Sequence, residues 1–130
     1  MPGDRPDRCA KAVASGADCV CIDLEDAVAQ SAKAEARGYA VLPKVGSPAD
    51  VDGAREARAL RHPETMLVPL IETAEGLLHA VEIARARGVA TVFFGGVDLA
   101  ADLGAAFTWE ALLYARSRVV HAAALAGVAA

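Results

Sequence analysis

The chain has 130 residues, of which 55% are hydrophobic, and it carries a formal net charge of −4 with a pI near 5.3. This length indicates a single domain. The apolar content excludes a disordered tail, because there is enough hydrophobic surface to offset the entropy lost on ordering. The acidic balance is opposite to the basic surface of a nucleic-acid-binding protein, so we expect no nucleic-acid partner.

The sequence also offers no segment for export or membrane insertion. The apolar runs are interrupted by charged residues well before the roughly 20 residues that a membrane-spanning helix needs. The opening residues MPGDRPDRC lack the apolar centre of a signal peptide. The three cysteines are an odd number and favour a reducing compartment. We therefore expect a cytoplasmic protein with no membrane partner.

Short apolar runs alternate along the chain with segments rich in Ala, Arg and Glu that have a helical period. The predicted strands are residues 19–22, 40–45, 66–71 and 91–94. The predicted helices are 5–15, 27–37, a segment that begins at Ser47-Pro48, 74–87 and 108–126. Ser47 suits an N-cap and Pro48 the first helical position, and Gly88 and Gly127 are typical residues to end a helix. Strands and helices at this spacing predict βαβ units and a parallel sheet.

Three residues in these elements need their own interpretation. Pro43 and Pro69 fall inside predicted strands, where each removes a backbone donor from the sheet. We interpret both as lying near strand ends or bulges. Trp109, at the start of the last predicted helix, is expected to be an anchor of the core.

Polar residues follow every predicted strand. In chain order they are Asp23, Glu25 and Asp26 after the first strand, Lys44 at the end of the second, Glu72 after the third and Asp98 after the fourth. The carboxyl ends of parallel strands form the usual ligand site, so Glu72 and Asp98 can share one cation. Two carboxylates with open positions suit Mg²⁺, and Gly95 and Gly96 allow close backbone approach to a ligand. The other interpretation is that these acids cap the helices that follow, and the spacing leaves both open.

These motifs resemble the HpcH/HpaI aldolase and citrate lyase β-subunit family. The matching segments are PGDRPDR (2–8), GADCVCIDLEDAVAQSAKAEAR (16–37), VLPKVGSPADV (41–51), LVPLIETAEGLL (67–78), FFGGVDLAADLG (93–104) and LLYARSRVVHAAALAG (112–127). The pair PGDRP and DLEDAV resembles the citrate-lyase-β branch in particular. The resemblance implies an α/β fold of the TIM (β/α)8 barrel type and a Mg²⁺ cofactor. It also implies a lyase that cleaves or forms a carbon–carbon bond in a 3-hydroxyacyl-CoA such as citryl-CoA or malyl-CoA, with an acyl-CoA and an oxoacid as partners.

The resemblance also implies roles for individual residues. Glu72 and Asp98 are the metal ligands that it implies, with Glu72 also at the substrate. The acids Asp23, Glu25 and Asp26 line the same face, near the water molecules of the metal. Lys44 is either a cation that stabilises developing negative charge or part of a structural ion pair. Arg5 lies at the rim of the substrate site or at a solvated helix start, and Gly95 and Gly96 line the substrate.

A complete barrel of this type takes roughly 250 residues. We therefore expect residues 1–130 to form one partial domain, an incomplete barrel of about four parallel strands with flanking helices. Between Arg37 and Ala40 the chain is too short for the strand that carries the substrate-binding Arg of the family. Two main functions stay open: an active lyase, or a catalytically silent relative that keeps a metal or oxoacid site or acts as a subunit. A fragment with no site is a weaker third. Open sheet edges lead us to expect a homo-oligomer.

Overall fold

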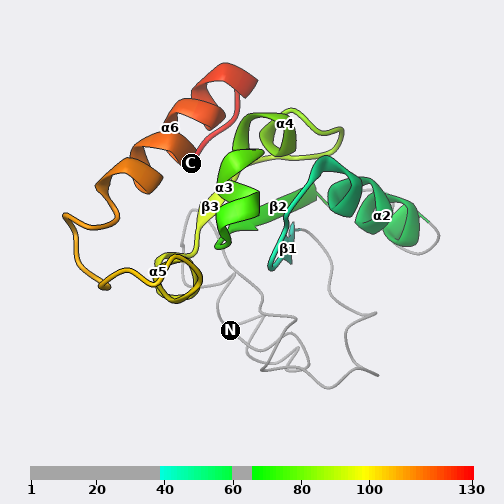
Figure 1. Cartoon of the computed structure of the whole chain (residues 1–130). Coiled ribbons are helices and arrows are strands. Elements are labelled where there is room, and N and C mark those ends of the chain that lie inside the picture. Colours follow the sequence, from blue (N-terminus) through cyan, green and yellow to red (C-terminus); the bar gives the residue numbers. More distant parts are fainter. Residues whose placement is uncertain (1–38, 60–65) are drawn as a thin grey trace, which may run out of the picture.

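The computed structural model describes residues 39–59 and 66–130 (Figure 1). In these residues the strands are β1 (Tyr39–Leu42), β2 (Met66–Ile71) and β3 (Phe93–Phe94). The helices are α2 (Pro48–Ala59), α3 (Ala74–Leu78), α4 (Ala80–Ala84), α5 (Gly96–Asp102) and α6 (Leu113–Ala126). The predicted elements 5–15, 19–22 and 27–37 lie outside the described residues, as do the predicted site residues Arg5, Asp23, Glu25 and Asp26.

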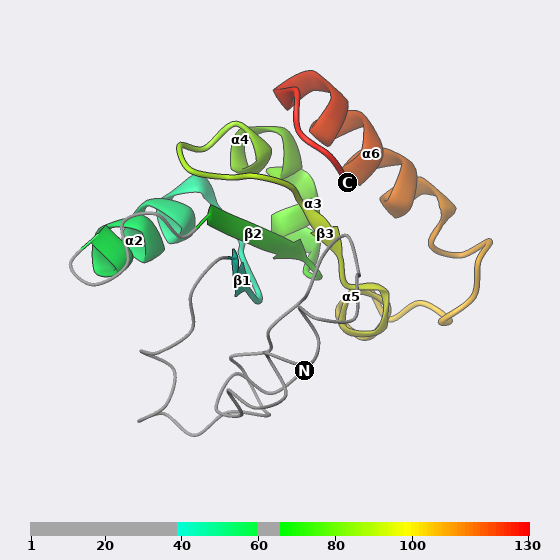
Figure 2. The ribbon, with the colours of Figure 1, turned by 180° about the vertical axis from the view of Figure 1, so that it is seen from behind.

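The three described strands form one parallel sheet in the order β1-β2-β3, which confirms the predicted α/β class with parallel strands. Val41 of β1 pairs with Val68 of β2, and Ile71 of β2 pairs with Phe94 of β3. This sheet is not closed into a barrel. Figure 2 shows the arrow of β2 pointing toward α5, so the carboxyl end of the sheet faces that helix.

The main core lies between the sheet and the helices α2, α4 and α6, which lie on one side of it (Figure 1). Leu67 and Ile71 of β2, Ile83 of α4 and Val119 of α6 are all buried and belong to the same hydrophobic cluster. Each such side chain contributes about 1.5–3 kcal/mol through its burial. Side chains alternate along a strand, so the residue after Ile71 points away from this core. That residue is Glu72.

Pro43 and Pro69 are both predicted near strand ends or bulges, and the structure agrees with this prediction for only one of them. Pro43 directly follows β1, which confirms its predicted place at a strand end. For Pro69 the prediction is wrong, because this residue lies inside β2 and is buried. Pro69 pairs with Leu42, the last residue of β1, and the next two residues of β2 pair with β3 instead. The proline therefore falls where the ladder between β1 and β2 ends.

The predicted helix start at Ser47-Pro48 is confirmed, since α2 begins at Pro48. The Asp50 carboxylate accepts hydrogen bonds from the main-chain N–H groups of Ser47 at 2.8 Å and Gly46 at 3.0 Å. These bonds, with that from Ser47 as the largest cause, hold the pKa of Asp50 below its usual value. Asp50 thus closes the start of α2 in the manner of a capping box.

The other predicted helices need correction. The segment 74–87 forms two short helices, α3 and α4, which meet at His79, and the second ends at Ala84. Gly76 within the first segment lowers its helix propensity. The segment 108–126 becomes helical only at Leu113, because residues 108–112 form turns, and it ends at Gly127 as predicted, with φ 73°.

The last predicted strand is also shorter than expected. Only Phe93 and Phe94 of the segment 91–94 form β3, while Thr91 makes an isolated parallel bridge to Ala129. Helix α5, which starts at Gly96, was not predicted. No helix in the described part of the chain is long and apolar enough to cross a membrane.

Candidate functional site

The ends of β1 and β2 and the start of α5 bring three predicted site residues together. The Lys44 ammonium donates a hydrogen bond to Asp98 Oδ2, and its Nζ lies 3.8 Å from Glu72 Oε1. Glu72 follows its strand as predicted. Lys44 differs, because β1 ends at Leu42 and not at residue 45, so Lys44 lies in the turn after the strand. Asp98 differs, because it lies in the first turn of α5 and not at the end of a strand. Of the two roles left open for Lys44, the ion pair is present, and its catalytic role stays a prediction.

Glu72 is the fixed member of the acid pair. It is only 5% exposed and is the buried charged residue among those described. Its Oε1 accepts the main-chain N–H of Lys44 at 2.8 Å. Lys44 has φ 52°, a left-handed conformation that a residue with a side chain rarely adopts. This turn aims the N–H of Lys44 at a carboxylate that would otherwise be costly to bury.

Gly95 is required by the position of Glu72. A Cβ atom at Gly95 would lie 2.6 Å from Glu72 Cβ and 2.7 Å from Glu72 Oε2. The Gly95 N–H also donates to the carbonyl of Ile71 at 3.0 Å. At Gly96 a Cβ would lie 3.0 Å from a ring carbon of Phe94. Both glycines thus face neighbouring side chains, and their contact with substrate stays a prediction.

Asp98 is the accessible member of the pair. Its side chain is 49% exposed and that of Lys44 is 56% exposed. One helical turn further along α5, Asp102 accepts the main-chain N–H of Ala74 at 2.7 Å. This bond fastens α5 to the start of α3 and so holds Asp98 near Glu72. Sequence reasoning missed Asp102, although its spacing of four residues places it on the same helix face as Asp98.

Glu72 and Asp98 suit a magnesium ion, which takes few protein ligands, better than a metal that needs three or more protein side chains. Lys44 shows that the gap between Glu72 and Asp98 accommodates a positive charge. Among residues 39–59 and 66–130 there is no group of three or more His, Cys, Asp or Glu side chains that could hold a metal. Two carboxylates are the usual protein share of a Mg²⁺ site, in which water and substrate supply the other oxygens.

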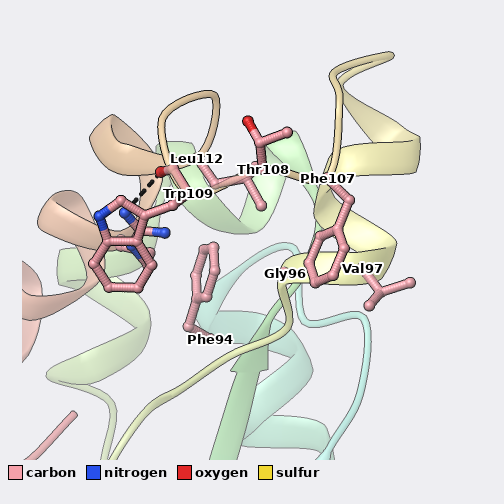
Figure 3. Close-up of a pocket in the computed structure, with 8 residues that line it drawn as sticks. Phe94, Gly96, Val97, Phe107, Thr108, Trp109 and Leu112 are labelled. Atoms are coloured by element: carbon pink, nitrogen blue, oxygen red, sulfur yellow. Dashed lines mark hydrogen bonds between the residues drawn. The ribbon is translucent and has the colours of Figure 1, made fainter.

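A cavity of about 380 Å³ lies beside the start of α5 (Figure 3). Its lining residues are Phe94, Gly96, Val97, Phe107, Thr108, Trp109, Leu112 and Arg116. The Arg116 guanidinium lies 3.3 Å from the centre of the Trp109 ring and donates to the Trp109 carbonyl at 2.7 Å. Trp109 is 70% exposed, so its expected place in the core is wrong. Residues 108–112 are turns, and they carry this side chain outward.

A parallel α/β sheet with carboxylates gathered at its carboxyl edge defines a class of proteins that bind ligands at that edge. Within this class, the sequence model of the HpcH/HpaI aldolase/citrate lyase family matches residues 1–42 and 39–130. The chain belongs to this family. The two matched segments overlap at residues 39–42. This overlap adjoins the sequence between Arg37 and Ala40, which is shorter than the family resemblance implies.

Three relatives illustrate the likeness. The citrate lyase subunit beta-like protein of Deinococcus radiodurans is 33% identical over 178 aligned positions, which cover 99% of this chain and 62% of that protein. The (3S)-malyl-CoA thioesterase of Cereibacter sphaeroides is 30% identical, over 82% of this chain and 50% of that enzyme. The crystal structure of CitE from Mycobacterium tuberculosis with magnesium, acetoacetate and coenzyme A is 29% identical, with a TM-score of 0.74 over 99% of this chain and 62% of that chain.

These matches show a shortened member of the family. The chain spans about half to three fifths of the length of these curated relatives. The first alignment covers 178 positions whereas this chain has 130 residues, so the relative has residues within the matched region that this chain lacks. The predicted shortening is therefore confirmed within the matched region.

Proposed function

We propose that this chain binds Mg²⁺ through Glu72 and Asp98 and acts as a lyase on a carbon–carbon bond of a 3-hydroxyacyl-CoA. The observation that carries the proposal is that one cationic group, the Lys44 ammonium, contacts Asp98 and lies 3.8 Å from Glu72 at the carboxyl edge of the sheet. The CitE relative, crystallised with magnesium, acetoacetate and coenzyme A, supports the choice of metal and substrate class.

The proposed reaction cleaves the bond between C2 and C3 of the acyl group. The 3-hydroxyl loses its proton and becomes the carbonyl of the oxoacid. The electron pair of the broken bond stays on the thioester as an enolate, which then takes up a proton. When bound, Mg²⁺ would lower the energy of the negatively charged oxygen. We assign the proton transfers to the acids Asp23, Glu25 and Asp26 and the rim of the site to Arg5.

Glu72, Asp98 and Lys44 would have different roles in the proposed reaction. Glu72 is buried and held by a main-chain donor, so its carboxylate is already oriented before any ligand binds. Asp98 and Lys44 are about half exposed, so both side chains can be reached from solvent, and the Lys44 ammonium can attract an anionic substrate. The Lys44 ammonium carries a positive charge on a half-exposed side chain, which can reach an enolate or carboxylate nearby and stabilise it.

A direct assay tests this function. Oxoacid release from citryl-CoA and malyl-CoA is measured with purified chain, with and without Mg²⁺. We expect Mg²⁺-dependent release that is lost in Glu72→Gln and kept in Glu56→Gln, an exposed acid of α2 that serves as the matched control. Thioester hydrolysis without carbon–carbon cleavage would instead assign the activity of the thioesterase relative.

The second candidate is a catalytically silent relative that keeps the metal site. The short sequence between Arg37 and Ala40 favours it, because the family resemblance implies that the segment missing there carries the substrate-binding Arg. In this case Mg²⁺ binds and Glu72→Gln abolishes the binding, but neither thioester is cleaved.

We also propose that copies of the chain associate and complete a barrel-like arrangement. The described residues form a sheet of three strands that does not close on itself, and the edges of an open sheet favour contacts between chains. Sedimentation velocity should then show a species larger than 13.4 kDa, and a single monomeric peak would contradict the proposal.

A further inference from the structure

Lys44 lies where a cation shared by Glu72 and Asp98 would bind. We infer that Lys44 is a positioning residue whose ammonium holds the two carboxylates together in the metal-free chain and competes with Mg²⁺ for them, so that metal binding displaces the side chain. This inference rests on the proposed function, because it requires Mg²⁺ at the same two acids.

The geometry makes joint occupancy unfavourable. The ammonium is hydrogen bonded to Asp98 Oδ2, and Nζ is 3.8 Å from Glu72 Oε1. A Mg²⁺ ion bound by both acids would lie roughly 2.1 Å from an oxygen of each, in the same gap. Two positive charges in the same gap repel each other strongly. The repulsion is stronger because the Glu72 carboxylate beside them is buried, where the effective dielectric constant is low. One of them must leave, and the ammonium is the one that is attached to a movable side chain.

Lys44 contacts Glu72 through two separate groups. Its main-chain N–H donates to Glu72 Oε1 at 2.8 Å, and this bond does not depend on where the side chain points. The side chain is 56% exposed and can turn into solvent without disturbing the core. Displacement would therefore leave Glu72 oriented by the backbone and open its carboxylate to the metal.

The backbone conformation of Lys44 also supports separate roles for its main-chain N–H and its side chain. Lys44 is the non-glycine residue with positive φ among those described, and such strained conformations persist where surrounding contacts hold them. The strained turn fixes the N–H on Glu72 and directs the side chain across the gap to Asp98, which lies 54 residues further along the chain. A surface lysine with no such role would not need this turn.

The test is isothermal titration of Mg²⁺ into the full chain and its Lys44→Met variant. This substitution removes the ammonium and keeps the main-chain donor. We expect Mg²⁺ to bind roughly two- to fivefold more tightly, the range expected when a competing half-exposed ion pair is removed. The metal-free variant should melt at a lower temperature than the wild type, and this difference should shrink when both are saturated with Mg²⁺.

Two variants control the experiment. Arg55→Met removes one positive charge at a separate ion pair with Asp52 on α2, and Mg²⁺ affinity should stay unchanged. Lys44→Arg keeps the competing charge, so its Mg²⁺ affinity should not exceed that of the wild type. Unchanged or weaker Mg²⁺ binding by Lys44→Met would overturn the inference while leaving the metal site in place. Absence of Mg²⁺ binding by the wild type would overturn the proposed function and this inference together.

A second measurement uses the wild-type sequence. The chain has lysines only at positions 11, 33 and 44, so ¹³C-dimethylation gives few NMR signals, and Lys44→Arg identifies the relevant one. We expect the Lys44 signal to move toward that of a solvated lysine on titration with Mg²⁺, and the other signals to stay. A Lys44 signal unmoved at saturating Mg²⁺ would contradict displacement even if Lys44→Met does not fold.

Discussion

The two carboxylates of the candidate site belong to regions of opposite character. Glu72 lies on the β1–β2 side, where it is 5% exposed and held by the Lys44 main chain. Asp98 lies on the α5 side, where its side chain is 49% exposed and its helix is fastened by Asp102. One carboxylate is thus held in place by the fold, and the other can adjust to what binds.

Packing is also tighter on the β1–β2 side than on the α5 side. On the β1–β2 side, a Cβ at Gly76 would lie 2.2 Å from the Val45 carbonyl oxygen, so the segment after β1 touches the backbone of α3. On the α5 side the cavity beside Phe94 is open, and nothing lies within 4 Å of a Cβ built at Gly104. Substitutions on the first side should therefore unfold the site, and those on the second should tune it.

The largest effect is expected from Gly76→Ala. The new methyl group would collide with a main-chain oxygen, which cannot turn away as a side chain can. We expect a loss of roughly 2–4 kcal/mol of unfolding free energy in urea titrations. Gly53→Ala in α2 is the control, because it meets nothing within 4 Å and should stabilise the chain by about 0.5–1 kcal/mol. A mild effect at Gly76 would show that the β1–β2 side is less rigid than described.

Truncation of each acid should affect stability to a different extent. Glu72→Ala leaves a cavity and removes the carboxylate that accepts the Lys44 N–H, and it should cost about 2–3 kcal/mol of stability. Asp98→Ala removes a half-exposed ion pair and should cost less than about 1 kcal/mol. Both should abolish the rise in melting temperature that Mg²⁺ produces. Equal destabilisation by the two variants would argue against a fixed and an adjustable ligand.

Gly95→Ala tests the contact between the two regions, because Gly95 is the residue at the start of α5 that lies against Glu72. Its Cβ would fall 2.7 Å from Glu72 Oε2 and turn the carboxylate aside. We expect Mg²⁺ affinity in calorimetry to fall by at least about tenfold, together with a stability loss of roughly 1–3 kcal/mol. Gly104→Ala has φ 62° and should lose about 1 kcal/mol through strain while Mg²⁺ affinity is unchanged.

The smallest effect concerns Asp50, at the start of α2. Its folded pKa is lowered by hydrogen bonds from Ser47 and Gly46, so it stabilises the fold above its unfolded value of 3.8. That contribution is lost as the pH falls through the lower folded value. Asp50→Asn should therefore flatten the acid side of the stability curve, by less than about 1 kcal/mol at neutral pH because the carboxylate is exposed. Urea titrations between about pH 2 and pH 7 measure this pH dependence of stability. Mg²⁺ binding at neutral pH should not change.

The parts of the fold that depend on local chemistry followed from the sequence. The bounds of β2, the start of α2 at Pro48 and the stop at Gly127 all agree. Helix α5 did not, because two successive glycines are poor helix formers and GGVD resembles a loop. In the structure Gly95 is the N-cap and Gly96 lies in the first turn, where few intrahelical bonds are needed.

The site was predictable to the same degree. That Glu72 and Asp98 lie near one another followed from parallel strands that end at one edge. The contact of Lys44 with both, the Asp102 bond to Ala74 and the aromatic cavity did not, since they depend on how α5 and the turns after it pack. These contacts join residues far apart in the chain, and no local pattern encodes them.

The exposed Trp109 has a practical consequence. It is the chain's single tryptophan, so indole fluorescence arises at one point, under the Arg116 guanidinium and at the wall of the cavity. A molecule that enters the cavity alters the emission, whereas an ion held between Glu72 and Asp98 acts there only if α5 moves. The chain therefore contains a built-in optical reporter that distinguishes filling of the cavity from occupation of the acids.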